Sequence, residues 1–215
     1  MDTTRRAAGL GLVAYGIGTP LAFLNIGSPG GDFRNQVVTT YMSSGHWATA
    51  IALAYVGAFA ALGLLVFANR MRHELGSAGD ALWGLAVAGT ATGVIGWFLV
   101  GGIAVAFAEG GLPLAGVPHP VVYLISEMSN LIAVCASAFF VGAVALVLAA
   151  RATLPRWLRS ASYVAGPCGL LAAFFFPIFV FWLWAIAFGM WAATSDARPH
   201  VAATAERLNA VQRSS

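Results

Sequence analysis

The chain has 215 residues, of which 60% are hydrophobic and only 9% are charged. A soluble domain carries about 25% charged residues, and polar groups as scarce as these do not cover the surface of a soluble protein. The composition excludes a soluble domain and predicts an all-α, polytopic bundle of transmembrane helices in contact with the lipid bilayer. The net charge of +3 does not indicate nucleic-acid binding, and because every basic residue is an arginine, lysine Schiff-base chemistry is excluded.

Apolar segments of about 20 residues, long enough to cross a hydrocarbon core of roughly 30 Å, recur along the chain. Four spans are expected at about 10–26, 47–68, 81–108 and 120–150. The polar residues between the first two spans include apolar side chains at helical spacing. They favour an outer amphipathic segment at about 32–45, with a simple connector as the alternative.

The last apolar stretch, residues 160–194, is long for one crossing and short for two. One long helix kinked at Pro177 gives five spans, whereas a turn near Phe176 and Pro177 gives six. We prefer six. Residues 1–194 then form a single helix-bundle domain, followed by a polar tail over residues 195–215.

Arginines predict the orientation of this bundle. Arg5, Arg6, Arg70, Arg72, Arg151, Arg156 and Arg159 precede or connect spans on one side, and Arg34 alone belongs to the other side. Cytoplasmic loops of membrane proteins are enriched in arginine, so we expect a plasma-membrane protein with a cytoplasmic N-terminus. The arginines of the tail favour a cytoplasmic tail, and therefore six spans.

Small residues in the third span predict close helix packing. Gly89 and Gly93 form a GxxxG pattern, and Gly96 and Gly101 follow. Glycines at this spacing let a neighbouring backbone approach closely. We expect these glycines to pack against other helices of the same bundle.

The fourth span carries the main candidate site. His119, Tyr123 and Glu127 are spaced four residues apart and Asn130 follows three residues later, so the four share one helix face. Counted from His119, Glu127 lies about 12 Å along the helix, within the hydrocarbon. Acidic residues at such depth usually face the bundle interior and have a partner or a function.

Two interpretations of this intramembrane polar site remain open. Glu127 is either protonated or hydrogen-bonded, with Tyr15, Thr19, Tyr55 and Asn130 as the expected partners. In the functional interpretation it carries a proton or binds a cation that arrives from outside along His119 and Tyr123. In the structural interpretation the polar residues only pack helices together.

Metal and haem chemistry is weakly indicated. His46 and His119 open two spans on the same side and are weak candidate metal ligands, but no paired spacing fixes their geometry. Cys135 and Cys168 are far apart and form no metal-binding or disulfide pattern. We predict no cofactor and no catalytic residue.

Four short segments carry a family resemblance: residues 37–46, 54–56, 67–72 and 154–158, which read VVTTYMSSGH, AYV, FANRMR and LPRWL. Together they resemble a group of small actinobacterial membrane proteins of unknown function. The resemblance implies a protein of about six helices, and it carries over no catalytic residues.

Three functional classes follow from these observations. The first, which we prefer, is an accessory or structural subunit of a larger membrane complex, because little of the chain lies outside the predicted spans. The second is a small proton-coupled transporter or ion-binding protein that uses Glu127. The third is a haem- or metal-binding membrane protein, and an enzyme is not expected.

Overall fold

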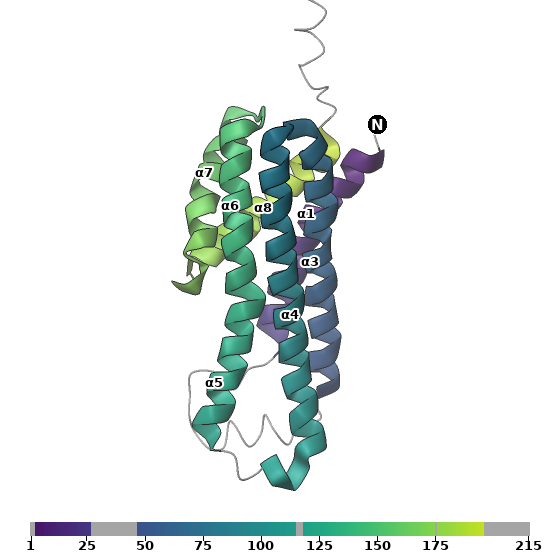
Figure 1. Cartoon of the computed structure of the whole chain (residues 1–215), viewed down its shortest axis with the longest axis vertical. Helices are drawn as coiled ribbons and strands as arrows, with labels where there is room; N and C mark the ends of the chain where they lie inside the picture. The colour runs from purple at the N-terminus through teal and green to yellow at the C-terminus, as the bar shows by residue number, and fades with distance from the viewer. Residues whose placement is uncertain (1–2, 27–46, 115–117, 175, 196–215) are drawn as a thin grey trace, which may run out of the picture.

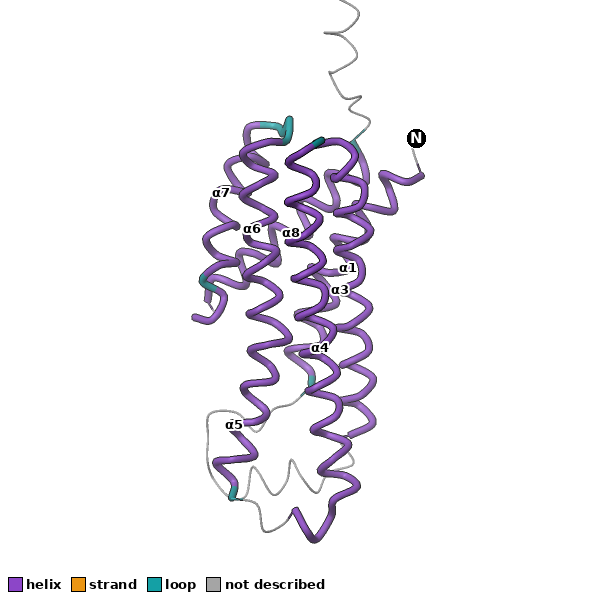
Figure 2. Tube along the Cα trace, viewed as in Figure 1, coloured by secondary structure: helices purple, strands orange, loops and turns teal. Residues whose placement is uncertain are grey.

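The computed structural model describes residues 3–26, 47–114, 118–174 and 176–195, and these residues contain helices and no strand (Figure 2). The elements are α1 (Thr3–Asn25), α3 (Trp47–Leu75), α4 (Ser77–Leu114), α5 (His119–Asn130), the π-helical η1 (Leu131–Ala136), α6 (Ser137–Arg151), α7 (Arg156–Leu170), the 3₁₀ turn η2 (Ala172–Phe174) and α8 (Phe176–Thr194). The predicted helical bundle is therefore confirmed for this part of the chain.

Five helices are long and apolar enough to cross a membrane, namely Thr3–Asn25, Trp47–Leu75, Ser77–Ala106, Leu124–Arg151 and Phe176–Thr194. The chain is a multi-pass membrane protein. The four expected spans coincide with α1, α3, α4 and the continuous α5–η1–α6 segment. The outer amphipathic segment at about 32–45 and the tail beyond Ser195 lie outside the described residues.

The last apolar stretch reverses direction, as the six-span alternative required. α7 descends only part of the bundle, and α8 returns to the end at which α1 begins (Figure 1). The reversal includes residues 171–174, and Pro177 stands in the first turn of α8. Proline is tolerated there because the first turn of a helix has no intrahelical acceptor for its N–H. At 15 residues, α7 is shorter than a full crossing.

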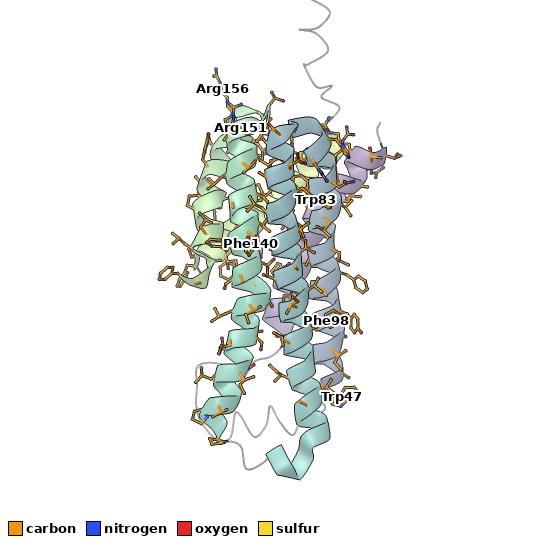
Figure 3. All side chains as sticks on the ribbon, in the orientation of Figure 1. Trp47, Trp83, Phe98, Phe140, Arg151 and Arg156 are labelled. Carbon is orange, nitrogen blue, oxygen red and sulfur yellow. The ribbon has the colours of Figure 1, made fainter. Side chains whose placement is uncertain are left out.

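The described arginines gather at one end of the bundle, which we call the arginine-rich end: Arg5, Arg6, Arg70, Arg72, Arg151, Arg156 and Arg159. Figure 3 shows Arg151 and Arg156 at this end and Trp47 toward the opposite end. The two ends therefore differ in charge as the sequence predicted, and α8 ends at the arginine-rich end (Figure 1).

Glycines set the close spacing of the helices. A Cβ on Gly96 would overlap the backbone of Ala133 in η1, and a Cβ on Gly93 would lie 3.1 Å from the Ser137 hydroxyl. Gly101 faces α3 at Ala54. The expectation that these α4 glycines pack within the same bundle is confirmed, because van der Waals contact between close backbones holds membrane helices together.

α1 lies between α3 and α8. Gly11 faces Gly63 of α3, and Gly9 faces Gly189 of α8, in both cases at backbone contact. Aromatic rings fill the space farther along the α1–α8 contact, where Tyr15 packs edge-on against Phe181 with ring centroids 6.2 Å apart. The first and last described helices are thus joined along their length.

Candidate functional site

The helix α5 turns its polar side inward. Ser126, Ser129 and Asn130 are buried, while Leu124 and Met128 are exposed on the opposite side. In a soluble helix the apolar face is the buried one. The reversed arrangement suits a helix whose outer face contacts lipid and whose inner face lines a polar interior.

The four predicted site residues all belong to α5. Asn130 is buried and Glu127 is half-buried. His119 and Tyr123 lie in its first two turns, and their side chains are outside the described residues, so the stripe from His119 to Glu127 stays a prediction. His46 also lies outside the described residues, and within them no group of three metal-ligating side chains is found.

A π-helical turn begins immediately after Asn130. In η1 the backbone hydrogen bonds span five residues, an arrangement that is rare and frequently found at functional sites. Two contacts hold this turn: Ala133 lies against Gly96 of α4, and the Cys135 thiol donates a hydrogen bond to the Ala172 carbonyl at 3.4 Å. The turn thus connects α5 with α4 and with the reversal before α8.

Asn130 has a buried polar atom without a partner. Its side chain is 3% exposed, and its Oδ1 atom has no hydrogen-bond partner among the described residues. An unsatisfied buried acceptor costs about 1–3 kcal/mol, so such groups are commonly met by a water, an ion or a ligand. The unpaired Oδ1 of Asn130 is therefore the main indication of a binding position among the described residues.

Two further buried polar groups belong to α1 and α8. Thr19 Oγ1 and Trp182 Nε1 have no hydrogen-bond partner among the described residues, and their side chains are 1% and 3% exposed. Trp182 packs against α1 at Phe23, with ring centroids 6.2 Å apart.

Other buried polar groups are paired. The Ser137 hydroxyl donates to the Gly89 carbonyl at 2.8 Å and lies 3.1 Å from the Tyr15 hydroxyl. Because the Ser137 proton is directed to Gly89, Tyr15 donates to Ser137. This three-helix link joins α1, α6 and α4 near the middle of the bundle.

The expected partners of Glu127 occupy different places. The Tyr15 hydroxyl bonds Ser137, and Tyr55 is exposed on the outside of the bundle, where its ring packs edge-on against Phe98 with centroids 5.3 Å apart. The expected hydrogen bond to Thr19 is wrong, because Thr19 Oγ1 has no partner among the described residues. The physical reason is that Thr19 faces the aromatic contact with α8.

Sequence reasoning missed several residues of the polar region. Ser126 and Ser129 are spaced with Asn130 at i, i+3 and i+4, which places the three on one helix face, so this buried face was readable from the sequence. Trp182 carried no such signal, since an indole in an apolar run looks the same whether or not its N–H is paired.

Comparisons with protein-family models, with curated proteins and with solved structures find no match for this chain.

Proposed function

We propose that this multi-pass membrane protein binds a proton or a small cation at the junction of α5 and η1, through Glu127 and Asn130. The observation that carries the proposal is the inward polar face of α5, which ends in the unpartnered Oδ1 of Asn130 at the start of a π-helical turn. A helix-packing cluster would instead pair its polar groups, as Tyr15 and Ser137 do.

The chemistry of the available groups supports this proposal. Carboxylate and amide oxygens are the ligands that hard cations prefer, and a carboxylate also accepts a proton. Glu127 and Asn130, at i and i+3, offer a carboxylate oxygen and an amide oxygen on the same side of the helix.

The helical rise supports a site that water reaches. At about 1.5 Å per residue, Glu127 is roughly 36 Å from Arg151, and Trp47 is roughly 34 Å from Arg70. Both distances slightly exceed the hydrocarbon thickness of about 30 Å. If the arginines lie in one headgroup layer, Glu127 lies near the opposite boundary of the hydrocarbon. This position is shallower than the depth expected from the number of residues between His119 and Glu127.

Charge-displacement measurements test the proposal. Proteoliposomes adsorbed on a solid-supported membrane are given separate jumps of proton, Na⁺ and K⁺ concentration. We expect a transient current for one of these ions, abolished by Glu127→Gln and reduced by Asn130→Leu. Asp80→Asn is the matched control, because Asp80 is an exposed carboxylate at the arginine-rich end. No current in any jump, or an unchanged current in Glu127→Gln, contradicts the proposal.

An accessory subunit of a membrane complex is the second candidate. It is favoured by the short described connections, such as Gly76 between α3 and α4, which leave little chain outside the helices. Affinity purification from native membranes tests it, with a stoichiometric partner as the expected result. A protein that purifies alone and shows the ion-dependent current contradicts this candidate and supports the first.

The proposed orientation has the arginine-rich end in the cytoplasm of the cell, following the positive-inside rule. Labelling of single cysteines introduced at Ser77 and at Pro118 with an impermeant reagent tests this orientation. We expect labelling of intact cells at position 118 and not at position 77.

A further inference from the structure

A groove of about 520 Å³ opens at the arginine-rich end between α1, α3 and α4. One part of its wall is polar, with Asn69, Arg70 and His73. The part nearer the middle of the bundle is apolar and includes Leu65 and Val66, and the indole of Trp83 forms the α4 side. The groove therefore has a basic zone and an apolar zone, in the order found across one leaflet of a membrane.

The shape of the groove favours an amphiphile over a soluble anion. Val66 is exposed on the outside of the bundle and is one turn from Arg70 on the same side of α3. An alkyl chain lying along Leu65 and Val66 stays in contact with the hydrocarbon, while its headgroup reaches Arg70 and His73. Indole rings are enriched at the headgroup level, which agrees with the place of Trp83.

Arg70 is the arginine that lines the groove, and its ion pair with Glu74 is of a weak kind. Arg72 is held by Asp80 at 2.8 Å and lies over the Trp83 ring at 5.9 Å. Arg70 pairs with Glu74 at 3.0 Å, and both side chains are 31% exposed. An exposed pair of this i, i+4 kind contributes well under about 1 kcal/mol, so a phosphate group competes with Glu74 at little cost.

The surrounding charge complements an anionic headgroup. Among the described residues of this end, seven arginines face only two carboxylates, Glu74 and Asp80. Basic pockets between transmembrane helices on the cytoplasmic side are typical sites for phospholipid headgroups of negative charge. A zwitterionic headgroup gains less from this excess of positive charge.

A second groove at the same end provides a comparison. It lies between α4 and α6, has a volume of about 350 Å³, and is lined by alanine and other aliphatic residues with Arg151 as its only charged residue. It has an apolar zone but no second polar group to hold a headgroup. Each groove is lined by one arginine, and they differ in the polar residues that surround it.

From these observations we propose that the groove between α1, α3 and α4 is a binding site for one anionic phospholipid of the leaflet at the arginine-rich end. The phosphate binds Arg70 and His73, and an acyl chain lies along Leu65 and Val66 beside Trp83. The site is independent of the proposed ion site at Glu127, because the two lie at opposite ends of the bundle.

Native mass spectrometry of the detergent-purified protein tests this proposal. Phosphatidylglycerol is the anionic probe, phosphatidylcholine the zwitterionic probe and inorganic phosphate the soluble probe. We expect one phosphatidylglycerol to bind more tightly than phosphatidylcholine, and millimolar phosphate to leave it bound. Equal binding of the two lipids, or displacement by millimolar phosphate, overturns the proposal, the second result by identifying a soluble phosphate site.

Charge variants locate the headgroup. Arg70→Gln is expected to weaken phosphatidylglycerol binding roughly fivefold, the effect of about 1 kcal/mol per arginine near a membrane surface. Arg151→Gln removes the same charge from the same end and is expected to change the affinity less than twofold. Glu74→Gln removes the ion pair that competes for Arg70 and is expected to raise the affinity. Equal losses in Arg70→Gln and Arg151→Gln overturn the site, because they indicate diffuse attraction.

A variant that leaves every charge in place locates the acyl chain. Val66→Trp fills the apolar zone from its exposed side and is expected to lower lipid occupancy, whereas Val164→Trp, at an exposed position on α7 away from the groove, is expected to leave it unchanged. Far-UV circular dichroism confirms that both variants are folded. Unchanged occupancy in Val66→Trp overturns the assignment of the chain to this groove.

Discussion

The Tyr15–Ser137 hydrogen bond divides the bundle into two regions whose buried polar groups differ. In the region toward the arginine-rich end, hydrogen bonds are formed by Thr90, Ser162 and Trp184. Beyond that bond, Thr19, Trp182 and Asn130 each have a buried polar atom with no partner among the described residues. Both regions belong to one bundle and have similar apolar surroundings. The paired groups stabilise the fold, whereas the unpaired groups are available to a water, an ion or a ligand.

The energetic logic of this difference is simple. A paired buried polar group contributes about 1 kcal/mol, and removing its partner costs about 1–3 kcal/mol. An unpaired group costs energy in the folded state, so its replacement by an apolar group of similar shape is neutral or stabilising. Stability measurements therefore distinguish the two regions without any knowledge of a ligand.

The largest effect is expected where η1 meets α4. Gly96→Val inserts a side chain into the backbone of Ala133, and we expect it to lower the free energy of unfolding by about 3 kcal/mol. Gly102→Val is the matched control, since a Cβ at Gly102 meets nothing within 4 Å. Unfolding by SDS in mixed micelles, followed by circular dichroism, measures both variants. Equal stability of the two variants shows that the contact at η1 is not tight.

Breaking the three-helix link is expected to have the next largest effect. Ser137→Ala leaves the buried Tyr15 hydroxyl without its acceptor, and we expect a loss of about 2 kcal/mol in the same assay. Tyr15→Phe removes the other partner, and the double variant should lose less than the sum of the single variants. If the losses of stability in the two single variants add up to that of the double variant, the Tyr15 and Ser137 hydroxyl groups do not interact with each other.

Two tryptophans of α8 give a matched pair with a smaller effect. Trp184 donates its indole N–H to Ser162 at 2.8 Å, whereas Trp182 has no such partner among the described residues. Trp184→Phe is expected to cost about 1 kcal/mol more than Trp182→Phe, the contribution of one hydrogen bond. If Trp182→Phe costs as much, the indole of Trp182 has a partner of its own, such as a buried water.

The smallest change in stability is expected at the proposed ion site. Asn130→Leu replaces an unsatisfied amide with an apolar side chain of similar size, so we expect a change within about 1 kcal/mol or a gain. The same variant is expected to reduce the ion-dependent current. A loss of stability as large as that of Ser137→Ala would identify Asn130 as a structural residue.

The spans were largely predictable from the sequence, for a physical reason. In lipid, a backbone satisfies its hydrogen bonds either as a helix or within a closed β-barrel. A long apolar segment that belongs to no barrel therefore forms a helix. Whether residues 160–194 form one helix or two was harder to predict, because Pro177 is equally compatible with a kink inside one helix and with the first turn of a second helix. The structure has it in the first turn of α8. Helix length alone did not decide between these alternatives.

The candidate site was predictable only in part. The spacing of Glu127 and Asn130 indicated an interior polar position, and Asn130 is indeed buried. The π-helical turn left no trace in the sequence, since one shifted hydrogen-bond register does not alter the apolar pattern of so short a segment. The pairing of Tyr15 with Ser137 depends on residues 122 positions apart, which no local pattern reports.

The position of α1 has a consequence for how the protein is made. Arg5 donates a hydrogen bond to Ser195 at 3.2 Å, and its guanidinium lies over the Trp191 ring at 5.8 Å. α1 therefore completes its contacts with a helix that is synthesised much later in the chain. Until α8 is made, the face of α1 that carries Gly9 and Gly16 lacks its partner helix. A chain truncated before α8 exposes that face to the quality control of membrane insertion.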